Sequence, residues 1–204
     1  DAFIFSCTHP ALFKNVVMPH PLAGVGTLGL ENKKVGMLIF LASEVMFFTG
    51  LLGAYMVLRY TAKNWPEVSS LLDFRLGVSN ACLLVLSSFI FIFSLNCLSA
   101  GKIKTARTGW LIVLILGTVF LGVQFLECRE LWTVRNIYFS TSLFGAWFYV
   151  LSAFHALHLL AGILCLTWFM AVSKPANTFE ALGLYWHFVN AAGLLLFVIL
   201  YVIA

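Results

Sequence analysis

The amino-acid sequence predicts an all-α integral membrane protein, a bundle of five transmembrane helices. The chain has 204 residues, of which 62% are hydrophobic and only 10% are charged. A soluble domain carries roughly 25% charged residues, so a chain of this composition could not cover its surface with polar groups. The apolar residues also come in continuous blocks. Such blocks predict membrane-spanning helices, because the strands of a membrane β-barrel alternate between apolar and polar residues.

Each apolar block is long enough for one crossing, since a helix needs about 20 residues to span a hydrocarbon core about 30 Å thick. The blocks cover residues 35–58, 77–101, 108–126, 136–173 and 181–204, and one residue in them is charged, Glu44. We therefore predict spans at about 35–58, 77–100, 108–127, 141–172 and 182–203. The block at 136–173 is too short for two crossings and a turn, so it predicts one long or tilted helix.

Residues 1–34 are predicted to form an interfacial lead-in, and residues 35–204 the transmembrane domain. Three prolines, at 10, 19 and 21, interrupt any apolar run in the lead-in. Lysine and arginine are more frequent on the side of the membrane that holds the N-terminus, which predicts a cytoplasmic or matrix location for that side. The seven basic residues of that side are Lys14, Lys33, Lys34, Lys102, Lys104, Arg107 and Lys174, against Arg59, Lys63, Arg75, Arg129 and Arg135 opposite.

Charge and cysteine usage exclude several classes of function. The net charge of +4 is spread over short loops, and nucleic-acid binding needs a concentrated basic face, so no nucleic-acid partner is predicted. The five cysteines have no paired spacing, which predicts neither a disulfide framework nor a zinc site. They stand at positions 7, 82, 97, 128 and 165.

Glu44 is the first candidate for a functional residue. It lies about nine residues into the first predicted helix, or roughly 14 Å deep at 1.5 Å per residue, which is near the middle of the membrane. Polar groups inside hydrocarbon are costly and are functional candidates by default. We expect Glu44 to be a buried acid that handles protons or makes a structural hydrogen bond to another helix.

Three histidines in the spans raise the question of a haem or metal site. His155 and His158 are three residues apart on the fourth helix and share a side, while His187 lies near the start of the fifth. His158 lies roughly 21 Å from the inner end of its helix and His187 only about 8 Å, so one iron cannot reach both without unusual tilts. The preferred interpretation is packing, interhelix hydrogen bonding or lipid contact, with no metal on this chain. His9 and His20 lie outside the spans.

Gln124 and Glu127 stand at the end of the third predicted helix. We expect them to form a polar helix end at the membrane surface, where Glu127 would be too far from mid-membrane Glu44 to form a carboxylate pair.

Four of these segments, in order, resemble subunit III of haem–copper terminal oxidases. The first is Lys34-Val-Gly-Met-Leu-Ile-Phe-Leu-Ala-Ser-Glu-Val-Met-Phe-Phe-Thr-Gly50 in the first span. The others are Leu121-Gly-Val-Gln-Phe-Leu-Glu127, Phe154-His-Ala-Leu-His-Leu-Leu-Ala-Gly162 and Tyr185-Trp-His-Phe-Val-Asn190, one in each of the last three spans. The resemblance covers roughly residues 33–204.

The resemblance implies a fold and a role. The family's long form has seven helices in a two-plus-five arrangement with lipids between, and this chain resembles the last five. The family binds no haem or copper in this subunit, which packs on the catalytic subunit, supports its proton uptake and protects it during turnover. Glu44 stands at the family's buried glutamate. The positions that match the other motifs, with a lipid-binding or structural polar role, are Gln124, Glu127, His155, His158, Trp186 and His187.

Three positions depart from the family pattern. Asn190 stands where many members carry Asp, so an ionic role there is lost. Gly53 occupies a position where longer forms can carry a lipid-facing Trp. The fourth helix ends with Lys174 rather than an Arg, which removes a matching headgroup contact.

The resemblance leads to a functional hypothesis. The chain is expected to be an accessory, non-redox subunit of a proton-pumping respiratory oxidase that reduces oxygen to water. Its partners would be catalytic subunit I, which carries haem and copper, other oxidase subunits, phospholipids and a larger respiratory supercomplex. A bacterial plasma membrane is preferred over the mitochondrial inner membrane.

Three alternatives stay open. The chain could be a haem-bearing five-helix anchor of another oxidoreductase, the accessory subunit of a nitric oxide reductase, or a free-standing proton channel or transporter that uses Glu44.

Overall fold

The computed structural model describes residues 32–63, 65–66, 71–140, 142–172 and 176–203. Five α-helices account for most of them, and the described residues include no strand. The helices are α1 (Asn32–Thr61), α2 (Phe74–Ser99), α3 (Ile103–Thr133), α4 (Leu143–Val172) and α5 (Ala176–Phe197), which continues as the π-helix η2 (Val198–Ile203). All five are long and apolar enough to cross a membrane, which confirms the predicted all-α class and the five spans.

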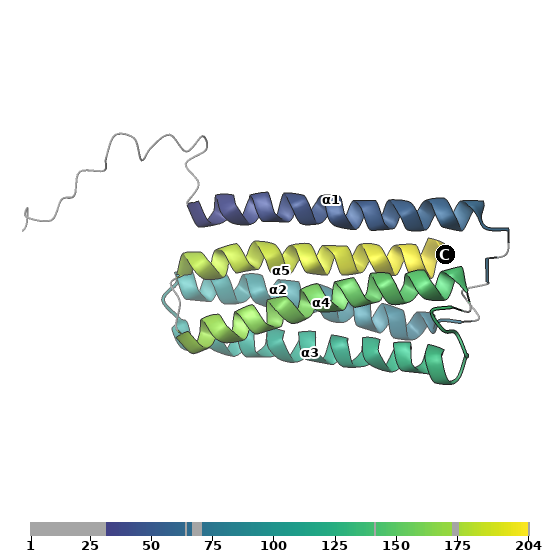
Figure 1. The fold of residues 1–204 in the computed structure, drawn as a ribbon. Coiled ribbons are helices and arrows are strands. Elements are labelled where there is room, and N and C mark those ends of the chain that lie inside the picture. Colours follow the sequence, from purple (N-terminus) through teal and green to yellow (C-terminus); the bar gives the residue numbers. More distant parts are fainter. Residues whose placement is uncertain (1–31, 64, 67–70, 141, 173–175, 204) are drawn as a thin grey trace, which may run out of the picture. The chain divides into compact units, whose positions relative to one another are not determined.

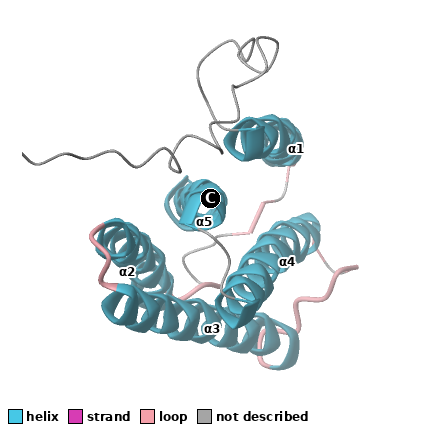
Figure 2. Ribbon diagram, turned by 90° about the vertical axis from the view of Figure 1, so that its left-hand side faces the viewer, coloured by secondary structure: helices cyan, strands magenta, loops and turns pink. Residues whose placement is uncertain are grey.

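Four of the helices form a closed ring, and α1 lies outside it. In the ring, α2 packs on α3, α3 on α4, α4 on α5, and α5 returns to α2. Figure 1 shows the helices running side by side, and Figure 2 shows α5 between α1 and the other three. Helix α1 contacts α5 and, to a smaller extent, α4. Among the described helices, none packs on the opposite face of α1.

The turn between α2 and α3 is set by a glycine in the left-handed region. Gly101 has a φ of 75°, a conformation that glycine adopts without a steric penalty. Its N–H donates to the carbonyl of Leu98 (3.0 Å), and the N–H of Lys102 donates to that of Cys97 (2.9 Å). This pair of bonds is a Schellman motif, which satisfies the last carbonyls of α2. The short turn makes α2 and α3 antiparallel neighbours.

Helix α3 is longer than the sequence interpretation allowed. It continues to Thr133 instead of ending near Glu127. The polar residues after the apolar block were interpreted as a helix end, but backbone hydrogen bonding carries on through them. As a result Glu127 lies inside the helix and not at its end, and it is buried, with 5% of its surface exposed.

The core is divided into two apolar clusters along the bundle. Because neighbouring helices are antiparallel, α1, α3 and α5 begin at one end, here called the proximal end, and finish at the other, the distal end. The proximal cluster contains Trp110 stacked on Phe179, with 4.1 Å between the ring centroids. The distal cluster contains Tyr55 and Phe144. The polar residues of interest lie between the clusters or at the distal end.

Candidate functional site

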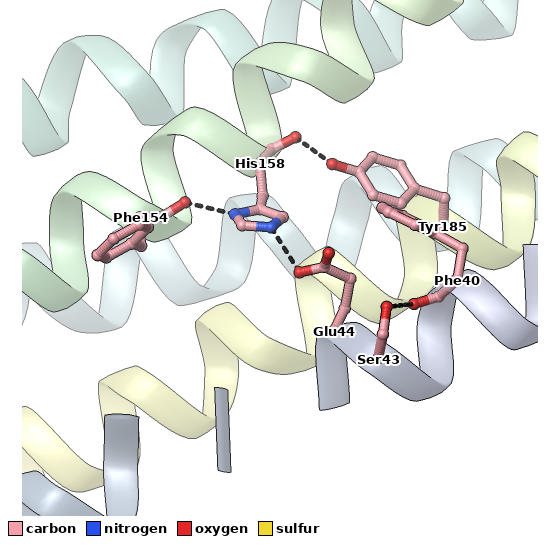
Figure 3. Close-up of polar contacts among 6 residues, drawn as sticks. All are labelled: Phe40, Ser43, Glu44, Phe154, His158 and Tyr185. Atoms are coloured by element: carbon pink, nitrogen blue, oxygen red, sulfur yellow. Dashed lines mark hydrogen bonds and ion pairs between the residues drawn. The ribbon is translucent and has the colours of Figure 1, made fainter. Parts of the chain in front are cut away.

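Glu44 and His158 form a polar pair between α1 and α4. Glu44 Oε2 lies 2.9 Å from His158 Nε2, and the two side chains are 17% and 18% exposed. Figure 3 shows the carboxyl of Glu44 directed at the imidazole, which comes from the neighbouring helix. Ser43 does not take part, because its hydroxyl donates to the carbonyl of Phe40 in its own helix (2.6 Å).

The second ring nitrogen of His158 decides where the protons of this pair are. Nδ1 lies 2.7 Å from the backbone carbonyl of Phe154. A carbonyl oxygen can only accept, so Nδ1 must carry a hydrogen. The contact between His158 Nε2 and Glu44 Oε2 then holds one proton, which belongs either to the acid or to the imidazole. Both forms of the pair have zero net charge.

Aromatic side chains surround the pair. Phe48 meets the His158 ring edge-on, with 5.1 Å between the centroids. The centroid of the Phe47 ring lies 6.3 Å from that of His158. The hydroxyl of Tyr185 donates to the backbone carbonyl of His158 (2.8 Å) and so ties α5 to this turn of α4. Three helices therefore hold the pair in an apolar setting, where charge separation is expensive.

His155 is one turn away from His158 but in a different environment. It is buried inside the ring, 3% exposed, and its Nε2 donates to the backbone carbonyl of Val189 on α5 (3.2 Å). Phe120 of α3 meets its ring edge-on, with 5.4 Å between the centroids. The two histidines that the sequence placed on one side thus have separate partners, and His155 has no surface for a lipid.

Trp186 and Asn190 belong to a buried hydrogen-bond cluster between α2 and α5. The Ser87 hydroxyl donates to the carbonyl of Leu84 (2.8 Å) and accepts from Trp186 Nε1 (3.3 Å) and Asn190 Nδ2 (3.0 Å). Asn190 Nδ2 also donates to Ser88 (2.7 Å). Trp186 is fully buried, which leaves no surface for the lipid contact that was one of its two expected roles. Its indole packs between Gly117 and Gly162, each of which leaves space for it.

Glu127 and Gln124 lie toward the distal end of α3 and make contacts inside the bundle. The Tyr201 hydroxyl donates to Glu127 Oε1 in a short hydrogen bond, and Gln124 Nε2 donates to Ser152 of α4 (3.4 Å). His187 is half-buried, and the ring of Phe91 meets it edge-on at 6.0 Å between centroids. The structure therefore brings Glu44 together with His158 and keeps the other predicted site residues in separate contacts.

Two of the three histidines in the spans use ring nitrogens for contacts inside the bundle. Both ring nitrogens of His158 are engaged by Phe154 and Glu44, and Nε2 of His155 is engaged by Val189. Over the described residues, no three His, Cys, Asp or Glu side chains gather closely enough to hold a metal ion.

Of the positions that depart from the family pattern, Gly53 is exposed with nothing within 4 Å of an added β-carbon, and Lys174 falls outside the described residues.

Sequence reasoning missed the residues of α2, together with Tyr185 and Tyr201. The buried residues of α2 recur at intervals of three and four, and its small polar members stand seven apart at Asn80, Ser87 and Ser94. Seven residues make two helical turns, so this spacing is a sequence signal for one polar stripe facing other helices. No such signal singles out Tyr185 or Tyr201, because a tyrosine near a helix end also suits a membrane surface.

Comparisons with known proteins agree on one family. The model of the family described as cytochrome c oxidase subunit III matches residues 3–204. A cytochrome c oxidase subunit 3 of Thermostichus vulcanus is 30% identical over 181 residues, which cover 85% of this chain and 88% of that protein. A probable cytochrome c oxidase subunit 3 of Nocardia farcinica is 33% identical, with 82% and 86% covered. The subunit 3 of Pelomedusa subrufa is 28% identical, with 93% and 77% covered.

Proposed function

The chain belongs to the cytochrome c oxidase subunit III family, and from this premise we propose that it is an accessory subunit of a proton-pumping haem–copper oxidase that reduces oxygen to water. It carries no redox centre in this proposal. Its role is to stabilise the catalytic subunit and to support the uptake of protons there. In this proposal haem and copper are held by partner subunits, and three of the four ring nitrogens of His155 and His158 have partners within the bundle.

The observation that carries the proposal is the contact between Glu44 Oε2 and His158 Nε2, 2.9 Å apart, from which we infer one shared proton. The Phe154 carbonyl keeps Nδ1 of His158 protonated, so the pair is neutral whichever partner holds the shared proton. A charged acid near the bilayer centre costs about 2.5–3.5 kcal/mol on insertion scales, and a neutral pair avoids most of that cost. The pair can therefore remain in an apolar bundle while one proton lies between the two side chains.

The position of α1 supports a role in assembly. It packs on the rest of the bundle along one side only. In its most apolar stretch, only 11% of the helix is buried. Large apolar side chains cover its outer face: Val35, Leu38, Ile39, Val45, Met46, Val57 and Tyr60 are exposed. We propose that catalytic subunit I and phospholipids cover this surface in the complex, and that the complex joins a larger respiratory supercomplex.

The five helices make the chain an integral, multi-pass membrane protein. We propose a bacterial plasma membrane as its location, with the N-terminus on the cytoplasmic side. The orientation follows from the excess of lysine and arginine that the sequence assigns to the side of the membrane with the N-terminus, and the location from the bacterial relatives.

Purification of the tagged chain from its native membrane, under mild detergent, tests the proposal. We expect a subunit with twelve or more helices, together with haem and copper, to co-purify in a fixed ratio and to consume oxygen. Nitric oxide reduction without oxygen consumption would indicate the nitric oxide reductase alternative. A haem spectrum from the isolated chain would indicate the anchor alternative, and proton flux through the chain alone in liposomes would indicate the channel. Each of these three results contradicts the proposal.

A further inference from the structure

A small cavity with a partly polar lining lies among α2, α3, α4 and α5, and it is separate from the Glu44–His158 pair. Its volume is about 40 Å³, whereas a water molecule needs about 10–15 Å³ of accessible volume. The cavity therefore has room for at least one water molecule. Its polar lining consists of Asn80, Gln124, Ser152, His155 and Tyr201.

One polar atom of this lining has no partner in the described part of the chain. Asn80 is 5% exposed, and its Oδ1 is buried without a hydrogen bond among the described residues. An unpartnered buried acceptor costs about 1–3 kcal/mol, and buried polar groups are therefore nearly always satisfied by protein or by ordered water. The combination of space and an unpartnered acceptor points to a bound water.

A larger cleft approaches the same region from the distal end. Its volume is about 610 Å³, and its charged lining consists of Asp73, Arg75, Glu127, Glu130 and Arg135. The side chains of Asp73, Arg75, Glu130 and Arg135 are exposed, so the cleft faces water or lipid headgroups. Tyr201 lines both the cleft and the inner cavity.

The Tyr201–Glu127 hydrogen bond lies where the two spaces meet. The hydroxyl of Tyr201 donates to Glu127 Oε1, so it can still accept a hydrogen bond from a water in the cavity. Glu127 Oε2 is buried and has no partner among the described residues, and Glu127 lines the cleft. A water on the cleft side, bonded to Glu127 Oε2, would extend this series of hydrogen bonds to the cleft.

We propose that the inner cavity is a water-binding site, connected to the distal cleft through Tyr201 and Glu127. The ligand is water, and the path leads from the surface to Asn80 and His155 in the middle of the ring. Water, the Tyr201 hydroxyl and the Glu127 carboxyl then form one hydrogen-bonded chain. Water inside the bundle can exchange with water at the distal surface along this path, which does not involve Glu44.

A map of the assembled native complex by electron cryomicroscopy, at a resolution that shows ordered water, tests the site directly. We expect density for a water within hydrogen-bond distance of Asn80 Oδ1 and a further water bridging toward Tyr201. A cavity without density, or one closed by a different packing of these side chains, would overturn the proposal.

Thiol chemistry tests the connection to the surface independently. In a background without the five native cysteines, Ser152→Cys places a thiol of similar shape on the cavity wall. Silver ion is about as small as water and replaces the thiol proton, forming a sulfur–silver bond and releasing H⁺. After silver is added to membranes that contain the assembled complex, we expect Ser152→Cys to lose its reactivity toward a maleimide added on denaturation.

Ser94→Cys is the matched control, because Ser94 is fully buried in α2 and does not line the cavity. We expect its thiol to survive the silver treatment. Addition of Asn80→Leu, which keeps the branched shape but replaces the acceptor by a methyl group, should disfavour water in the cavity and protect the thiol at position 152. Survival of both thiols, or loss of both, would contradict a water path that ends at this cavity.

Discussion

Gly193 of α5 lies directly against the imidazole of His155 in α4. A β-carbon added at position 193 would stand 2.6 Å from His155 Nε2 and 2.6 Å from a methyl group of Leu84. Real β-carbons do not approach other atoms so closely, so any larger residue must push α5 or His155 away. The buried histidine and the glycine therefore depend on each other.

Gly193→Ala is expected to destabilise the protein, because the imidazole must move and its bond to Val189 is strained or lost. Overpacking of this kind costs about 1–3 kcal/mol. The measurement is the temperature at which the chain dissociates from the complex or precipitates. Gly122→Ala is the control, since an added β-carbon there meets nothing within 4 Å, and it should be neutral or slightly stabilising. Equal behaviour of the two variants would mean that the close contact is not present.

Ser87→Ala is expected to loosen the contact between α2 and α5. The change removes the acceptor for Trp186 Nε1 and one of two acceptors for Asn190 Nδ2, all inside the bundle. An orphaned buried donor costs about 1–3 kcal/mol. The same thermal measurement applies, and Ser79→Ala is the control, because the exposed Ser79 hydroxyl bonds only within its own helix. A Ser87→Ala variant as stable as the control would show that this cluster does not hold the two helices together.

The spans were predictable from the sequence because their apolar blocks are longer than any soluble helix needs. The ends were less predictable. Helix α3 extends to Thr133 through polar residues, and composition does not show where backbone hydrogen bonding stops. A cap such as Asp73, which accepts from the N–H of Arg75 at the start of α2 (2.9 Å), is readable only after the helix is known.

The members of the site were predictable, but their pairing was not. Glu44 and His158 stood out because polar groups inside a span are rare. Their contact depends on how far α1 is shifted along α4, and neither helix carries that information by itself. The same limit applies to Glu127, whose partner Tyr201 lies 74 residues later.

Glu44 is expected to react with an apolar carbodiimide such as dicyclohexylcarbodiimide, which attacks a protonated carboxyl group. In the pair with His158 we predict that the acid holds the proton, because the aromatic surroundings disfavour separated charges. Glu44 is 17% exposed, at the seam between α1 and α4, so an apolar reagent can reach it.

Mass spectrometry of the labelled chain provides the measurement. The Glu44→Gln variant is the control, since it lacks the carboxyl group and should stay unlabelled at position 44. Labelling of Glu127 in preference to Glu44 would contradict both the neutral pair and the access from the seam.

Oxygen consumption by the assembled complex that carries Glu44→Gln tests the central claim most directly. An amide at position 44 can donate to His158 Nε2, so the contact is kept while the shared titratable proton is lost. We expect intact assembly and nearly normal oxygen reduction at neutral pH, because the proposal places the redox centres on other subunits. The loss should appear as slower proton uptake at high pH, or as fewer turnovers before inactivation. Loss of all oxygen reduction at neutral pH, with assembly preserved, would show that Glu44 is a required catalytic group and would contradict the accessory role.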